Sequence, residues 1–151
     1  PTVTVKIGTT KLSSSNYTVT YASGRKNVGK YKVTVKLKGN YSGSVSKTFT
    51  IKPKATTLSK LTAGTKKLTA TWKKLTTQTS GYQIQYSTSS SFKSPKTVTV
   101  SKNTTTKKTI SSLKSGKKYY VRIRTYKTVK VNGKSTKIYS SWSKLMSVKV
   151  K

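Results

Sequence analysis

The most informative stretch of the sequence is residues 113–124, which read LKSGKKYYVRIR. A glycine turn comes first, and Tyr119, Val121 and Ile123 then alternate with other side chains. Successive side chains of a strand point to opposite faces, so a period of two indicates a half-buried strand. We therefore predict a strand over residues 119–126, with these three side chains in a core and their neighbours facing outward.

The same alternation continues on both sides of that strand. Downstream, Asn132-Gly133 favours a type I′ hairpin turn, and residues 138–150 predict a last strand with a bulge near Ser143. No segment shows a 3.6-residue period, so we predict no helix. Upstream strands are expected over residues 67–72, 82–86, 97–100 and 108–113.

The N-terminal third of the chain is a separate block of alternating segments. Pro53 ends it, because proline has no N–H for a sheet ladder and polar residues follow. We predict an all-β fold with two tandem antiparallel β-sandwich modules, residues 1–53 and 58–151, joined by a linker at 54–57. Strands of the first module are expected over residues 2–7, 17–21, 30–38 and 44–52.

The composition excludes most enzyme classes. The 151 residues include 33 Lys and Arg but no Asp, Glu, His or Cys, which gives a net charge of +33. Without carboxylates or imidazoles there is no side chain for general acid–base catalysis or a catalytic triad, and none for a zinc, calcium or haem site. We therefore predict a non-enzyme with no catalytic residues, cofactor or metal.

The absence of acidic residues leaves two origins open, an engineered charge or a natural lineage that works against polyanions. No salt bridge between side chains can form, so self-repulsion should destabilise the fold at low salt. No run of apolar residues is long enough for a membrane span. The sequence begins at Pro1 rather than Met, which indicates a processed product or a fragment of a longer chain.

Residues 58–150 resemble a fibronectin type III domain. The stretch from Leu113 to Ile123 is similar to the family's Leu-x-x-Gly-x-x-Tyr-x-Val-x-Val element. Leu68-x-Ala70-x-Trp72 is similar to the family's second strand, and Ser140-Ser141-Trp142-Ser143 looks like the start of its last strand. The resemblance implies that Tyr119 forms a tyrosine corner, its hydroxyl bonded to upstream backbone. The chain has no Arg-Gly-Asp motif, so the family's best-known adhesive site is not carried over.

Residues 1–53 resemble the later part of a bacterial immunoglobulin-like repeat, on the motifs YTVTY at 17–21, NVG at 27–29 and GNYSG at 39–43. The resemblance covers only part of such a repeat and implies a first module that is incomplete at its N-terminus and open to a strand from elsewhere. Paired modules of this kind are similar to the stalks of secreted or wall-associated proteins of Gram-positive bacteria. The resemblance implies an extracellular, cell-wall location and a role in spacing, display, adhesion or attachment.

Two surfaces are candidate binding sites. On the outward face of the predicted strand, basic and aromatic side chains interleave, beside Gln83 and Gln85 on an expected neighbour. Arg binds phosphate or sulfate with two donors and Tyr stacks on sugars or bases; the alternative is an ordinary solvated face with Arg stacked on Tyr. The residues of this face are Lys118, Tyr120, Arg122, Arg124 and Tyr126.

The second candidate is the hairpin around Asn132-Gly133, which we expect to protrude as a cationic finger. The alternative is a charged hairpin whose lysines protect a sheet edge. Trp72, Trp142, Tyr82 and Tyr119 are expected to pack in the core rather than to form a carbohydrate platform. The hairpin's basic residues are Lys127, Lys130, Lys134 and Lys137.

Three functions compete at this point. The first is attachment to anionic polymers such as teichoic acid or anionic glycans by diffuse charge, which predicts steep salt sensitivity and little dependence on any one residue. The second is specific recognition of an acidic protein surface or host receptor. The third is a structural spacer that self-associates through the open first module. Nonspecific nucleic-acid binding is expected in vitro from charge alone.

Overall fold

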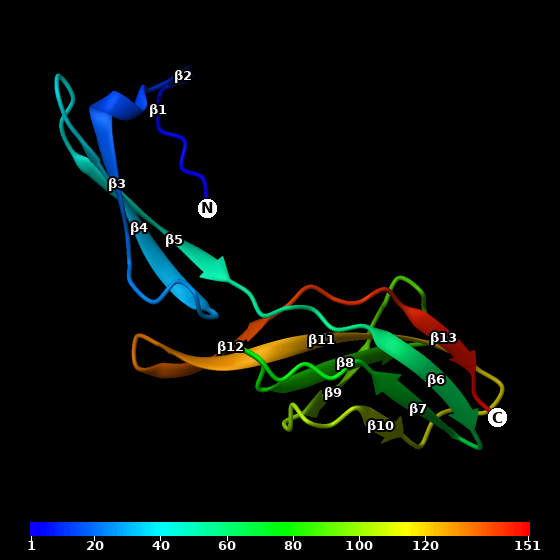
Figure 1. Cartoon of the computed structure of the whole chain (residues 1–151). Coiled ribbons are helices and arrows are strands. Elements are labelled where there is room, and N and C mark those ends of the chain that lie inside the picture. The colour runs from blue at the N-terminus through cyan, green and yellow to red at the C-terminus, as the bar shows by residue number, and fades with distance from the viewer. The chain divides into compact units, whose positions relative to one another are not determined.

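The computed structural model describes residues 1–151 and divides into two compact units, Pro1–Ile51 and Lys52–Lys151. We call them unit 1 and unit 2 (Figure 1). The predicted linker at 54–57 is bonded to unit 2, where Thr125 Oγ1 donates to the Lys54 carbonyl at 2.7 Å and Lys73 N–H donates to Thr57. These residues therefore extend the edge of unit 2.

Unit 2 consists of two antiparallel sheets. One has the strand order β10-β7-β6, and the other has the order β12-β11-β8-β9, with β13 also paired to β11. The all-β, antiparallel fold class predicted from the alternation is confirmed. The strands are β6 (Leu58–Gly64), β7 (Lys67–Trp72), β8 (Gly81–Ser87), β9 (Lys96–Val100), β10 (Lys107–Ile110), β11 (Lys118–Val131), β12 (Lys134–Tyr139) and β13 (Met146–Lys149).

The core of unit 2 lies between these sheets and is built by alternation. In β11, Tyr119, Val121 and Ile123 are buried, as predicted, and the side chains between them are more exposed. Burial of such side chains is the main driving force for joining the two sheets. The buried cluster is made of Leu68, Ala70, Trp72, Tyr82, Ile84, Ile110, Leu113, Tyr119, Val121, Ile123 and Val150.

The tyrosine corner expected at the start of β11 is present. The backbone N–H of Lys114 donates to Tyr119 Oη at 3.1 Å, which ties the turn to the strand. At the other end of β11, the predicted hairpin turn has positive φ at both central residues, Asn132 (50°) and Gly133 (77°). Two positive φ values are what a type I′ turn requires, and Asn and Gly are the residues that tolerate them.

The last strand is interrupted near Ser143, as the sequence indicates. β12 pairs with the far part of β11 and β13 pairs with residues 118–121, while the chain between them bonds irregularly. The hydroxyl oxygens of Ser140 and Ser143 accept from the N–H groups of Thr125 and Ile123, each at 3.1 Å. Serine side chains thus take the place of backbone partners across the bulge.

Unit 1 contains a three-stranded sheet of order β3-β4-β5, formed by β3 (Tyr17–Tyr21), β4 (Gly29–Leu37) and β5 (Ser44–Ile51). A two-stranded pair, β1 (Lys6–Ile7) and β2 (Thr10–Lys11), precedes it. The inner face of the larger sheet carries Tyr21, Tyr31 and Phe49, whose rings are in contact at one end.

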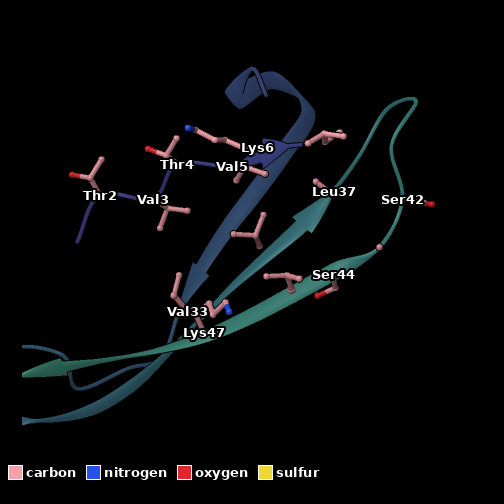
Figure 2. Close-up of a pocket in the computed structure, with 14 residues that line it drawn as sticks. Thr2, Val3, Thr4, Val5, Lys6, Val33, Leu37, Ser42, Ser44 and Lys47 are labelled. Atoms are coloured by element: carbon pink, nitrogen blue, oxygen red, sulfur yellow. The ribbon is translucent and has the colours of Figure 1, made fainter. Parts of the chain in front are cut away.

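One prediction for unit 1 is wrong. The strand predicted over residues 2–7 is limited to Lys6–Ile7, because residues 2–5 have the alternating pattern but pair with no neighbouring strand (Figure 2). The polar loop before β3 contains a single three-residue 3₁₀ turn, η1 (Ser14–Asn16), and the structure has no α-helix, as predicted. The Ser13 hydroxyl accepts from the Ser15 N–H and caps this turn.

Candidate functional site

The outward face of β11 holds two arginines that are fixed by the neighbouring strand. β11 and β8 pair with Arg122 opposite Gln85 and Arg124 opposite Gln83. Arg122 donates to Gln85 Oε1 from Nε at 3.0 Å and from Nη2 at 2.7 Å, and Arg124 Nε donates to Gln83 Oε1 at 2.8 Å. The sequence indicated that these glutamines lie beside the arginines, and the structure shows that their amide oxygens orient both guanidinium groups.

Aromatic rings enclose the same two guanidinium groups. Arg122 Cζ lies 4.0 Å from the Phe92 ring centre and 4.6 Å from the Trp142 ring centre. Arg124 Cζ lies 4.2 Å from Trp142 and 3.8 Å from Tyr139. The five side chains form one continuous column, which we call the Arg–Trp stack. Each cation–π contact contributes about 0.5–1 kcal/mol where solvent reaches it and more where it does not.

The Arg–Trp stack corrects the expectation for Trp142. This residue was predicted to pack in the core, but it is half-buried on the outer face, between the two arginines. The bulge between β12 and β13 breaks the alternation on which the prediction depended. The sequence signal was present in Ser140-Ser141-Trp142-Ser143, since serines whose hydroxyls bond to backbone are suited to an irregular strand. Trp72, Tyr82 and Tyr119 lie in the core as predicted.

Electrostatics within the stack also differ from those of a free surface. Burial lowers the pKa of the Arg124 guanidinium, the charge interaction with the Tyr139 phenol group opposes that change, and the nearby charge of Arg122 adds to it. Arginine nevertheless stays protonated, because its ordinary pKa lies far above neutral pH. The stack therefore holds two positive charges in a fixed geometry without any acidic partner.

The remaining predicted residues of the strand are arranged less uniformly. Tyr120 is half-buried, with Lys118 Nζ 5.5 Å from its ring centre. Tyr126 was predicted to be available on the outer face, but it is only 4% exposed. Tyr139 packs against it at 6.0 Å and Lys137 Nζ lies 4.7 Å from its ring. Tyr126 is therefore a packing residue and offers no surface for a ligand.

The lysines of the hairpin point to two different sides. Residues opposite each other in an antiparallel pair share a face, and the pairs are Thr128 with Lys137 and Lys127 with Ile138. Lys130 and Lys137 consequently lie on the face of the Arg–Trp stack. Lys127 and Lys134 lie on the opposite face, so the four lysines do not form one cationic surface.

Two packed antiparallel sheets with a tyrosine corner place unit 2 in the immunoglobulin-like class of β-sandwiches. A model of the fibronectin type III domain matches residues 53–142, and the chain belongs to this family. Domains of the family are typically non-catalytic binding or spacer modules and are commonly extracellular. No helix in the structure has the length and apolar character needed to cross a membrane.

Comparison with solved structures supports the same fold. The crystal structure of the chicken CNTN1 FN1-FN3 domains is similar, with a TM-score of 0.52 and 19% sequence identity over 83% of this chain. The chain spans 42% of the length of that structure. A sequence search of curated proteins finds no match.

Proposed function

We propose that this chain is a non-catalytic extracellular module that attaches to anionic polymers through positive charge spread over both units. The observation that carries the proposal is the net charge of +33 without a single acidic side chain. Nine of the 33 basic residues lie in unit 1 and the other 24 in unit 2. Every anionic group that approaches therefore meets attraction from either unit and finds no repelling carboxylate side chain.

The geometry of unit 2 favours diffuse attraction over a single pocket. In the Arg–Trp stack, three guanidinium N–H groups already donate to glutamine amide oxygens. The Trp142 ring also covers a face of each guanidinium group. Most lysines, in contrast, are exposed on several strands and loops. Attachment of this kind is multivalent and weakens steeply as salt rises.

The setting that we propose is the wall of a Gram-positive bacterium, where teichoic acid and other anionic glycans supply the polymer. The bacterial immunoglobulin-like motifs of residues 17–21, 27–29 and 39–43 support this setting, as does the membership of unit 2 in a commonly extracellular family. On this proposal, unit 1 is a bacterial immunoglobulin-like module and unit 2 is the display module that follows it.

One observation favours a second candidate, specific recognition of an acidic protein surface. Arg, Trp and Tyr are the residues that most often dominate protein interfaces, and here they are held rigid before any partner arrives. This candidate makes Arg122, Arg124 and Tyr120 essential, whereas diffuse attraction makes them equivalent to any other charged positions.

Binding of the full chain to purified Gram-positive walls, with and without teichoic acid, tests the two candidates. The double change Arg122→Gln and Arg124→Gln is compared with Lys96→Gln and Lys108→Gln, which removes the same charge at exposed positions. A third variant, Arg122→Lys and Arg124→Lys, keeps the charge and loses the planar stack.

Diffuse attachment predicts binding that requires teichoic acid and is lost by about 0.5 M salt, where the screening length is only a few ångströms. The two glutamine variants then weaken binding equally, and the lysine variant binds like the wild type. Wall binding that persists at high salt and is lost only in the arginine variants would move the assignment to a specific partner. DNA serves as a competitor in both cases, since it should displace a diffuse polyanion.

A further inference from the structure

The tip of the hairpin between β11 and β12 carries the single Asn-Gly pair of the chain, Asn132-Gly133. Both residues are exposed, and both have positive φ, 50° and 77°. The side-chain amide of an asparagine can be attacked by the backbone nitrogen of the next residue, and a glycine there leaves the approach free of a Cβ. The hairpin tip therefore places two groups that can react with each other at an exposed position.

Neither reacting group is held by another part of the structure. The Asn132 side chain and the Gly133 N–H make no hydrogen bond, and no heavy atom lies within 4 Å of the place that a Cβ on Gly133 would take. Pairing of β11 with β8 ends at Tyr126, so the tip is attached only through the two-stranded ladder that ends at Val131 and Lys134 (Figure 1). A two-stranded ribbon is marginally stable, so the tip can open far enough for the Gly133 nitrogen to reach Asn132 Cγ.

The other four asparagines of the chain lie in less reactive surroundings. Asn103 Nδ2 donates to the carbonyls of Thr76 and Thr79 at 3.4 and 2.8 Å, and a β-branched threonine follows it. A tyrosine or a valine follows each of the remaining three, and such side chains crowd the backbone nitrogen that would have to attack. These three are Asn16, Asn27 and Asn40.

The charge around the hairpin tip favours the same reaction. Lys130 and Lys134 are two residues before and two residues after Asn132, and the chain has no acidic side chain to oppose them. A nearby positive charge stabilises the anionic form of a group, and the attacking form of the Gly133 nitrogen is the deprotonated, anionic amide. The carboxylate that the reaction produces is stabilised by the same two lysines.

We propose that Asn132 is a site of spontaneous deamidation, which gives the hairpin tip the one acidic side chain of the chain. The Gly133 nitrogen loses its proton to solvent and attacks Asn132 Cγ. A C–N bond forms, and the bond from Cγ to Nδ2 breaks and releases ammonia. Water then opens the cyclic imide: cleavage at Cγ gives aspartate, and cleavage at the main-chain carbonyl carbon of residue 132 gives isoaspartate.

The two products change the hairpin in different ways. Asp-Gly also favours a type I′ turn, so aspartate keeps the pairing of Val131 with Lys134 and allows an ion pair with Lys130 or Lys134. Isoaspartate inserts a methylene into the backbone, so the two-residue loop that sets the hairpin register is lost. This modification is independent of the polymer attachment proposed above, because it needs only the chain and water.

The test incubates the folded full chain in mildly alkaline buffer and follows each asparagine by mass spectrometry of its peptides. Chymotrypsin cleavage after Tyr126 and Tyr139 isolates residues 127–139, which contain one asparagine. Chromatography separates the aspartate and isoaspartate forms of this peptide. The variants are Gly133→Ala, which adds a Cβ beside the attacking nitrogen, and Lys130→Gln with Lys134→Gln, which removes the flanking charge. The same chain in urea is the unfolded control.

The expected result is that Asn132 in the folded chain is converted at least about tenfold faster than any other asparagine and yields both products. Conversion should speed up as the pH rises, because the attacking amide must lose its proton. Gly133→Ala should slow it about tenfold, and the lysine variant about two- to threefold at low salt.

Three results would overturn the proposal. One is equal conversion of all five asparagines in the folded chain. Another is an intact Asn132 in the folded chain while the same residue is converted in urea, since the type I′ turn would then protect the side chain rather than expose it. The third is an unchanged rate in Gly133→Ala, which would exclude attack by the backbone nitrogen of residue 133.

Discussion

Units 1 and 2 are both built from lysine-rich alternating strands, but their inner faces are covered to different degrees. Unit 2 has a second sheet over the first, and fourteen apolar or aromatic side chains are buried in it. Unit 1 has one three-stranded sheet faced by a short segment, and only Leu12, Val28 and Val35 are buried to the same extent. The inner face of the unit 1 sheet is therefore only partly buried, whereas the inner faces of the two sheets in unit 2 cover each other.

This difference shows that an alternating strand pattern and a buried core are separate requirements. A period of two places apolar side chains on one face in both units, yet only a second covering layer converts that face into a core. The sign of the charge does not explain the difference, because all the charged side chains of both units are basic. The central claim is that a second sheet covers the inner face of unit 2, whereas the inner face of the unit 1 sheet is only partly buried by residues 1–51.

The largest expected effect comes from a matched pair of core substitutions. Val121 and Val35 each lie on the central strand of a sheet and are 0% and 8% exposed. Val121→Ala should cost unit 2 about 3 kcal/mol, from the lost burial plus a cavity. Val35→Ala should cost unit 1 about 1.5 kcal/mol, because its paired neighbour Val45 is already 59% exposed.

Urea unfolding measures the two costs separately. Trp72 and Trp142 both lie in unit 2, so tryptophan fluorescence reports that unit, and NMR peak intensities of residues 17–51 report unit 1. Equal costs for the two substitutions would show that unit 1 is packed as tightly as unit 2 and would remove the contrast.

A smaller effect is expected from the outer face of the closed unit. Trp142→Ala removes the ring shared by Arg122 and Arg124 and should destabilise unit 2 by about 2 kcal/mol, from two cation–π contacts and the burial of the indole. Trp72 remains as the fluorescent reporter. The control Leu145→Ala, at a more exposed position, should change stability by less than about 0.5 kcal/mol. If Trp142→Ala also lowered stability by less than about 0.5 kcal/mol, the Arg–Trp stack would not be stabilising.

The smallest expected effect is on the pH dependence of unit 2. Burial raises the pKa of Tyr86, and the neighbouring Tyr119 adds to the shift. The folded state therefore keeps the Tyr86 proton at a pH where the unfolded state, with a pKa of about 10, releases it. Stability should fall as the pH rises above about 10, and it should fall less in Tyr86→Phe. Urea midpoints of the two proteins between about pH 8 and pH 11 check this, and parallel curves would contradict it.

The sequence predicted the parts of the fold in which local signals agree. Alternation from Tyr119 to Ile123 located the central strand of unit 2, and Asn132-Gly133 located its hairpin turn. It missed β6, because Leu58–Gly64 contains a bulge between Leu58 and Lys60 that interrupts the period. It also extended β1 over residues 2–7, because alternation does not reveal whether a partner strand is present.

The candidate site was predictable in its position but not in its packing. Alternation correctly placed Arg122 and Arg124 on one face beside the glutamines of β8. The Arg–Trp stack depends on Trp142, which the bulge moves to the outer face. It also depends on Phe92, which lies in a loop without a periodic pattern and has a positive φ of 56°. Alternation in the sequence predicts contacts between regular strands, but it does not predict contacts made by side chains in irregular segments.

Native-state hydrogen exchange of the full ¹⁵N-labelled chain tests the central claim most directly, because it measures both units in one sample. The account predicts that the amides of Val121 and Ile123, on central strand β11, exchange at least about 100-fold more slowly than those of Val33 and Val35, on central strand β4. Equal protection of the two strands would contradict the claim that the inner face of unit 1 is only partly covered.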